Sequence, residues 1–200
     1  MALTPAALGF RVKSGWAQAV LLAGPANSPR LVTCRVALLS DPAEPNSKQP
    51  YHLALELPEK EVTASVRKLR KLISCAAKNS VAALIKCADT AGFAVCGAAL
   101  VVGSMVDPAS LHNDHIRAHA LEGQLFRNVL EEAFLEREIP CRVLLEKTAY
   151  SAAAKELGKT KPQLISLAAK LGDSHDGSWR AEEKLAALAA LLVLSQQTKK

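Results

Sequence analysis

The sequence predicts one α/β domain spanning residues 1–200, with a mixed five-stranded sheet and helices on both of its faces. Three observations support this prediction. Half of the residues are hydrophobic and 22% are charged, which is typical of a globular chain that buries its own core. Three strand-like segments precede the first long helical pattern, which favours antiparallel pairing early in the chain. Helical and strand-like patterns then alternate, as in parallel strands joined by helices.

The first part of the chain is predicted to form three antiparallel strands. Residues 9–24 and 29–40 are both strand-like, and the link over 24–29 is rich in glycine, proline and other turn-forming residues. We therefore expect these two segments to pair as a hairpin. Residues 51–57, YHLALEL, alternate large apolar side chains with smaller or polar ones, which predicts a half-buried third strand.

The rest of the chain is predicted to alternate helices with parallel strands. A long helix begins at Pro58–Glu59, because proline suits the first helical position and acids favour a helix N-terminus. Residues 92–104 form a continuous apolar run, typical of a central strand covered on both faces. The other predicted elements are a helix over 115–138, a strand over 141–147, a small helical insert over about 148–178 with short helices at 151–157 and 163–171, and a final helix over 179–197.

The charge balance is mildly basic. Lysine and arginine outnumber the acids by 25 to 19, which gives a net charge of +6 and an isoelectric point near 9.1. This excess is compatible with a nucleic-acid partner but does not require one. The long helix carries a basic face that is either simply solvated or in contact with phosphates, formed by Arg67, Lys68, Arg70, Lys71 and Lys78.

The cysteine pattern indicates thiols rather than disulfides. The number of cysteines, five, is odd, and no two of them have C-x-x-C spacing. Most lie inside apolar runs, so we expect buried free thiols in a reducing, cytoplasmic environment. We expect no membrane partner, because no apolar stretch is long enough to span a bilayer. The cysteines are Cys34, Cys75, Cys87, Cys96 and Cys141.

Four segments carry a resemblance to a known family. LVVGSMVDP (100–108) resembles a strand that ends in a V-V-G-x-P type loop, and IPCRVLLEKTAYSAAAKEL (139–157) resembles a P-V-x-x-V-D-E-R-x-S-T-x-x-A strand and helix. EEKLAALAALLVL (182–194) resembles a D-A-x-A-A-x-L-I-L helix, and SGWAQAV (14–20) resembles the segment that follows a leading aspartate. Together they resemble the ribonuclease H-like superfamily, and within it the YqgF and RuvC branch of resolvase-like proteins. That resemblance implies the same fold.

The resemblance also implies an acidic metal site, and the sequence departs from it there. These nucleases hold two divalent metals with three or four carboxylates. Where the family has an aspartate in the first strand, this chain has Arg11, Val12 and Lys13.

Only one acid of the family pattern has a clear counterpart. Glu146 stands in the place of the acid of D-E-R, followed by Lys147 for the arginine and Thr148 for the serine. In the final helix the expected acid falls near Ala186, and the nearest acids, Glu182 and Glu183, lie about one turn earlier.

Two hypotheses for the function follow. The first is a diverged, non-catalytic resolvase-like protein that binds a partner, possibly nucleic acid, through basic residues near the strand ends: Lys13, Arg117, Lys147, Lys155 and Arg180. The second is an active nuclease that uses Mg²⁺ or Mn²⁺, with Glu146, Asp107 and Glu183 (or Glu182) converging on the metal. A lysine in the midst of these acids would exclude the nuclease hypothesis. The non-catalytic hypothesis needs no cofactor.

A third hypothesis is an oligomeric scaffold. The final helix is rich in alanine, which suits close helix packing, so it is a candidate interface between copies of the chain.

A histidine-rich segment, HNDHIRAHALEG (112–123), is a separate motif. His115, His119 and Glu122 are spaced i, i+4, i+7 and share a helix face. Two histidines at i, i+4 suit zinc or another transition metal, although H-E-x-x-H is absent. The alternative is a solvated first helical turn with Asp114 as the N-cap, and on this alternative the segment binds no metal.

Overall fold

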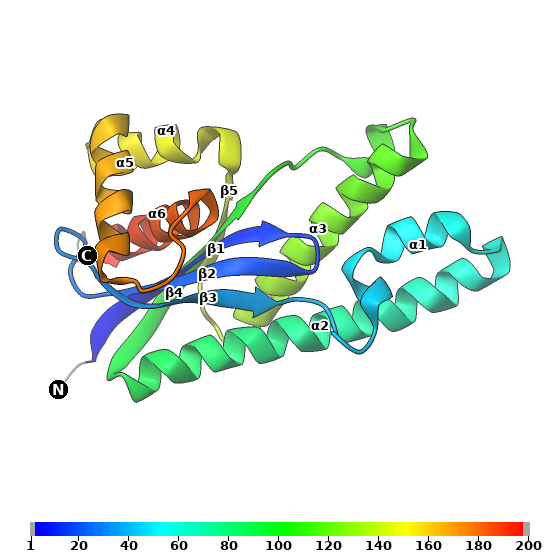
Figure 1. Ribbon diagram of the computed structural model, residues 1–200, viewed down its shortest axis with the longest axis horizontal. Coiled ribbons are helices and arrows are strands. Elements are labelled where there is room, and N and C mark those ends of the chain that lie inside the picture. Colours follow the sequence, from blue (N-terminus) through cyan, green and yellow to red (C-terminus); the bar gives the residue numbers. More distant parts are fainter. Residues whose placement is uncertain (1–2, 198–200) are drawn as a thin grey trace.

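The structure, a computed structural model, describes residues 3–197 and contains a five-stranded sheet in the order β3-β2-β1-β4-β5 (Figure 1). The β1–β2 and β2–β3 pairs are antiparallel, whereas β1–β4 and β4–β5 are parallel. The strands are β1 (Thr4–Lys13), β2 (Trp16–Ala23), β3 (Arg30–Leu38), β4 (Phe93–Val102) and β5 (Cys141–Leu145). The predicted mixed sheet, with antiparallel strands followed by parallel ones, is confirmed.

Two predicted elements at the start of the chain were wrong. Residues 9–24 are not one strand, because the chain reverses at Ser14–Gly15 and forms the β1–β2 hairpin there. Gly15 has a φ of +81°, a left-handed conformation that suits glycine. Residues 51–57 are not a strand, because α1 (Pro50–Glu56) occupies this segment with proline at its start. Its leucines and alanine are good helix formers, and seven residues are too few for alternation to decide between the two structures.

Two long helices cover one face of the sheet. They are α2 (Glu59–Thr90) and α3 (Asp114–Leu135), and α1 packs against both (Figure 1). Their apolar faces meet Leu8, Phe10 and Leu100 from the central strands in the larger hydrophobic core. Short 3-10 turns at 45–48 and 108–110 connect these elements.

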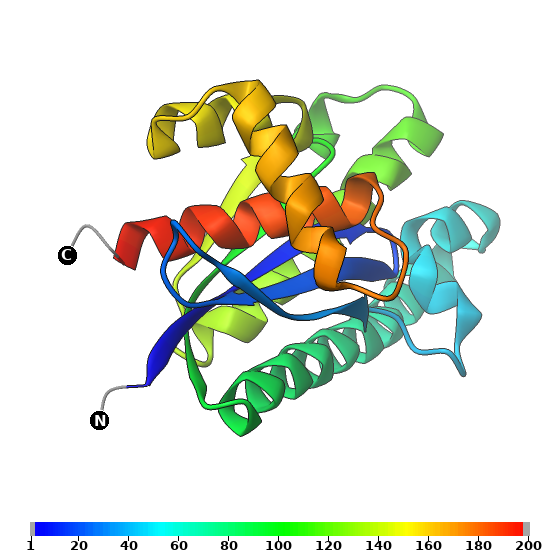
Figure 2. The same cartoon turned by 60° about the vertical axis from the view of Figure 1, so that its left-hand side comes forward.

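The opposite face carries α6 (Ala181–Gln197), with α4 (Glu146–Leu157) and α5 (Lys161–Lys170) beyond it, and a 3-10 turn at 171–174 (Figure 2). The small residues of α6 let it lie directly on β1: a methyl group added at Gly9 would be 1.9 Å from the carbonyl oxygen of Ala186. All residues from Leu185 to Leu194 are buried within this chain. The alanine-rich face that we expected at an oligomer interface is therefore covered by the chain's own sheet.

Helix α4 starts earlier than predicted. Strand β5 ends at Leu145, so Glu146 and Lys147 form the first turn of α4 instead of the strand's last residues. In residues 3–197, no helix combines the length and the apolar character needed to cross a membrane.

Candidate functional site

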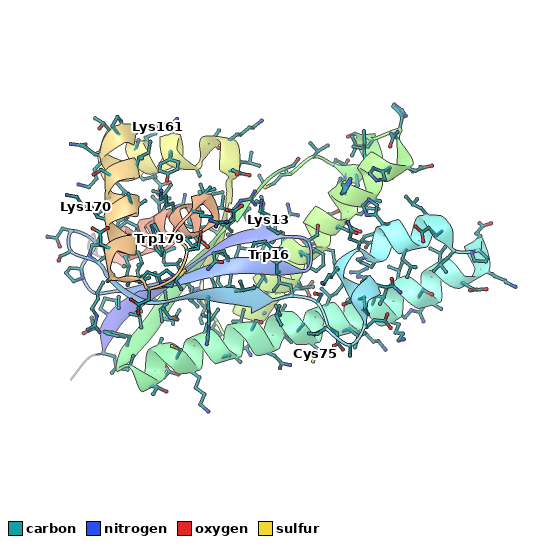
Figure 3. All side chains as sticks on the ribbon, in the orientation of Figure 1. Lys13, Trp16, Cys75, Lys161, Lys170 and Trp179 are labelled. Carbon is teal, nitrogen blue, oxygen red and sulfur yellow. The ribbon has the colours of Figure 1, made fainter. Side chains whose placement is uncertain are left out.

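The carboxyl ends of the three parallel strands meet at one edge of the sheet. Arg11 and Lys13 lie at the end of β1, Gly103 and Ser104 follow β4, and Glu146 follows β5. A cavity of about 260 Å³ opens at this edge, and its lining includes the first four of these residues. Figure 3 shows Lys13 at the tip of β1. We call this region the strand-end site, the position at which α/β sheets commonly bind ligands.

Arg11 is the buried charge of the strand-end site, with 5% of its surface exposed. One guanidinium nitrogen, Nη1, donates to the carbonyl oxygens of Val12 at 2.6 Å and Val101 at 3.5 Å. The other, Nη2, donates to Oε2 of Glu146 in a charged hydrogen bond. The cation is thus held by β1, β4 and the first turn of α4, and its acidic partner is Glu146, the one acid that the sequence resemblance singled out.

A second ion pair lies beside the first. Nζ of Lys13 is 3.4 Å from Oε1 of Glu182 in the first turn of α6. The pKa of the Glu182 carboxyl is lowered, first because it accepts a hydrogen bond from a backbone N–H and then because of the charges of Lys13 and Arg11. Two basic side chains of β1 therefore each face one carboxylate.

The other two proposed catalytic acids are engaged locally. Oδ1 of Asp107 accepts the N–H of Ala109 and caps the 3-10 turn at 108–110. Oε2 of Glu183 accepts the N–H of Arg180 at the start of α6. Among residues 3–197, the one group of histidines, cysteines and acids able to hold a metal ion does not include Glu146, Asp107 or Glu183.

The five proposed nucleic-acid-binding residues fall into two groups. Lys13 is paired with Glu182, and Arg117 donates to Asp114 at 2.8 Å and to the carbonyl oxygen of Leu111. The side chains of these two already have acceptors within the chain. The remaining three are exposed and lie on α4 or just before α6: Lys147, Lys155 and Arg180.

The group able to hold a metal ion consists of three histidines from two helices. His115 and His119 are on α3, as the sequence motif indicates, and His52 comes from α1. His52 was not predicted as a ligand, because its segment was interpreted as a strand. Glu122, one turn after His119, is fully buried behind the rings. The N-cap of α3 is Asn113, whose Oδ1 accepts the N–H of Ile116, so the prediction of Asp114 as the cap was wrong.

Comparisons with known proteins give a likeness in structure alone. No protein-family model matches the chain, and a search of curated proteins found no match. RuvC of Thermus thermophilus in complex with a Holliday junction substrate is similar with a TM-score of 0.56 and 11% identity, over 98% of this chain and 96% of that one. A second structure of Thermus thermophilus RuvC has a TM-score of 0.52 and 12% identity, over 97% of this chain and 96% of that one. The yeast mitochondrial Holliday junction resolvase Ydc2 has a TM-score of 0.50 and 12% identity, over 96% of this chain and 79% of that one.

These structures share the ribonuclease H-like fold, and the predicted resemblance to the resolvase branch is confirmed for the fold of this chain. At 11–12% identity the likeness concerns the backbone, so the chemistry of the site has to be argued from its own residues.

Proposed function

We propose that this chain is a diverged, resolvase-like protein, a single domain that binds branched nucleic acid at the strand-end site without two-metal hydrolysis. The observation that carries the proposal is the ion pair of Arg11 with Glu146. It puts a buried cation in the segment 11–13, where the resemblance places the family's leading aspartate.

The residues at this edge do not fit a magnesium site. Mg²⁺ needs several oxygen ligands that are free to turn toward it. Glu146 and Glu182 are the acids here, and each faces a cation. A divalent ion placed about 4 Å from the Arg11 guanidinium would be repelled by about 8 kcal/mol at an effective dielectric constant of about 20. Glu146 would also have to give up its bond to Arg11.

Nucleic-acid binding is supported by the exposed basic residues near this edge. Lys147 lies in the first turn of α4, and Lys155 lies two turns further along, about 12 Å away by helical rise. Arg180 precedes α6, whose first turn forms part of the same edge. The net charge of +6 adds a general attraction for phosphates. A neighbour in structure, RuvC, is known in complex with a Holliday junction substrate, so a four-way junction is the first probe to use.

The test is a binding titration of the full chain with a labelled four-way DNA junction and with duplex of the same length, at several salt concentrations. We expect tighter binding to the junction and an affinity that falls steeply with salt. Lys147→Glu should weaken binding at least 10-fold. Lys86→Glu is the matched control, because Lys86 is also exposed but lies in the last turns of α2, which lead into the start of β4 at the opposite edge of the sheet. No binding, or equal loss in both variants, would refute the proposal.

A catalytic role is the second candidate, and the fold shared with resolvases is the observation that favours it. The same junction incubated with Mg²⁺ or Mn²⁺ tests it. We expect no cleavage. Metal-dependent cleavage that Glu146→Ala abolishes would establish the nuclease instead, and the acids to examine next would be Asp107 and Glu183.

A further inference from the structure

We infer that His52, His115 and His119 form a binding site for a transition-metal ion of the zinc type, separate from the strand-end acids. One ring nitrogen from each histidine lies within 4.8 Å of the others. The three rings stand edge to face, with centroids 4.3 Å apart for His52 and His119, 4.7 Å for His115 and His119, and 4.8 Å for His52 and His115.

The three ring nitrogens, which lie within 4.8 Å of one another, need to move only slightly closer together to bind a metal. Zinc–nitrogen bonds of about 2.0–2.1 Å in a tetrahedron place the ligand atoms about 3.3 Å apart. His115 and His119 are exposed, so their rings are free to turn about their side-chain bonds. His52 is half-buried and held in place, which gives the site one fixed ligand and two that adjust to it.

Glu122 fixes the orientation of His52. Its Oε1 is 2.8 Å from Nδ1 of His52 and also accepts the backbone N–H of His52 at 3.3 Å. A carboxylate at this position keeps the proton on Nδ1 and leaves a lone pair on Nε2. This carboxylate–histidine arrangement is the one that commonly supports a metal-bound histidine.

Two buried atoms indicate that the cluster is built for a ligand. Nε2 of His52 and Oε2 of Glu122 are shielded and have no hydrogen-bond partner among residues 3–197. Ring packing alone explains neither the fully buried carboxylate nor the unpartnered nitrogen, since such groups are normally satisfied. A metal ion bound at Nε2 satisfies that nitrogen, and its positive charge compensates the buried carboxylate.

The ligand set determines the class of metal. Three imidazoles suit Zn²⁺ and similar transition ions, whereas Mg²⁺ prefers oxygen ligands. Three histidines also leave a fourth coordination position open. His119 lines the strand-end cavity together with Arg11 and Lys13, so an ion held here adds positive charge to the same surface. The metal site itself does not depend on the proposed nucleic-acid binding.

The experiment is a titration of the untagged, chelator-treated protein with Zn²⁺ by calorimetry and with Co²⁺ by visible absorption. We expect one ion per chain, a dissociation constant in the micromolar range or below, and the strong visible bands of tetrahedral Co²⁺, with Mg²⁺ failing to compete. His115→Ala and His119→Ala should each weaken binding at least 100-fold. Glu122→Gln should weaken it 10- to 100-fold, because the support of His52 is altered but not removed.

The controls are His112→Ala and His175→Ala, which remove the two histidines outside the cluster. Both should bind as the parent does. His115 and His119 are exposed, so their variants should keep the parent's circular dichroism, and a weaker affinity then reports the lost ligand. Absence of saturable one-to-one binding, or equal weakening by His112→Ala, would overturn the inference. Junction binding measured on the same proteins separates this result from failure of the proposed function.

Discussion

The side chain of Arg11 crosses β4 to reach Glu146. Arg11 lies near the end of β1 and Glu146 follows β5. These two strands are not neighbours in the sheet, and the guanidinium also donates to Val101 of β4, the strand between them. One buried cation therefore joins all three parallel strands at the edge where a metal-dependent enzyme of this fold would collect its acids. The ion pair thus gives Glu146 a counter-charge from within the chain.

This role predicts a measurable coupling between the two residues. Arg11→Met and Glu146→Gln each remove one partner, and Glu146→Gln should cost more because it leaves the buried cation of Arg11 without its counter-charge, whereas Arg11→Met leaves a carboxylate that water can reach. The double variant should be more stable than the sum of the single losses predicts, by about 1–3 kcal/mol. Urea unfolding of the four proteins measures this coupling energy. A value below about 0.3 kcal/mol would mean that the ion pair contributes nothing beyond its separate residues.

The contact of β1 with α6 predicts a severe effect of one methyl group. At Gly9 an added methyl would lie 1.9 Å from the oxygen of Ala186 and 2.6 Å from the nitrogen of Ala190, both backbone atoms that cannot move aside. We expect Gly9→Ala to lower the free energy of unfolding by about 3 kcal/mol or more, or to prevent folding.

Gly123→Ala is the matched control for Gly9→Ala. Gly123 lies inside α3, and within residues 3–197 no atom outside the adjoining helix backbone and its two chain neighbours lies within 4 Å of the added methyl. Because alanine is the better helix former, this variant should be more stable than the parent by about 0.5–1 kcal/mol. Thermal and urea unfolding compare the two. Equal destabilisation of both would contradict the close approach of α6 to β1.

The patterns that carried the fold prediction were the long ones. The uninterrupted apolar run over 92–104 and the final helix over 179–197 are strong signals, and both correspond to elements that lie in the core. The segment over 51–57 was too short for its periodicity to distinguish a strand from a helix. The hairpin at Ser14–Gly15 was missed because the apolar pattern continues on both sides of the turn.

The site was less predictable than the fold because its contacts join residues far apart in the chain. The sequence marked Arg11 and Glu146 as exceptional, but their bond spans 135 positions and depends on the order of the strands. His52 and Glu122 are 70 positions apart and meet only because α1 is a helix that packs on α3. Motif spacing finds ligands on one helix, such as His115 and His119, and misses the one that another element supplies.

The prediction of buried thiols was wrong in degree, because Cys75 is exposed and the other four cysteines are half-buried. Two of the half-buried thiols predict a loss of stability at high pH. Burial raises the pKa of Cys141 from 9.0 to about 12, and burial raises that of Cys34 to about 11. The unfolded chain loses these protons near pH 9, but the folded chain keeps them until higher pH. The stabilisation is therefore complete below pH 9 and is lost as the pH rises toward 11–12.

Unfolding free energies measured from pH 8 to 11 should fall, and Cys141→Ala should reduce the slope. Alkylation offers a direct comparison: exposed Cys75 should react with iodoacetamide well before Cys141. A pH-independent stability over this range, or equal alkylation rates, would contradict the partial burial of Cys34 and Cys141.

The pair of Lys13 and Glu182 predicts a pH dependence of the opposite sign. The folded-state pKa of Glu182 is lowered, mainly by its backbone hydrogen bond and further by Lys13. Its contribution to stability is therefore present above the ordinary range for glutamate and disappears as the pH falls through the lowered value. Lys13→Met should raise the pKa of Glu182 part of the way to normal, because the backbone hydrogen bond remains. The carboxyl ¹³C shift of Glu182 followed by NMR titration measures this change.

Lys86→Met is the control for Lys13→Met, because it removes the same charge at the opposite edge of the sheet and should leave the titration of Glu182 unchanged. The two variants should also differ in stability at neutral pH and converge at a pH where Glu182 is protonated in both states. An unchanged titration in Lys13→Met would mean that this lysine points into solvent. It would then be free to contact phosphate, as first expected from the sequence, and the set of binding residues would have to include it.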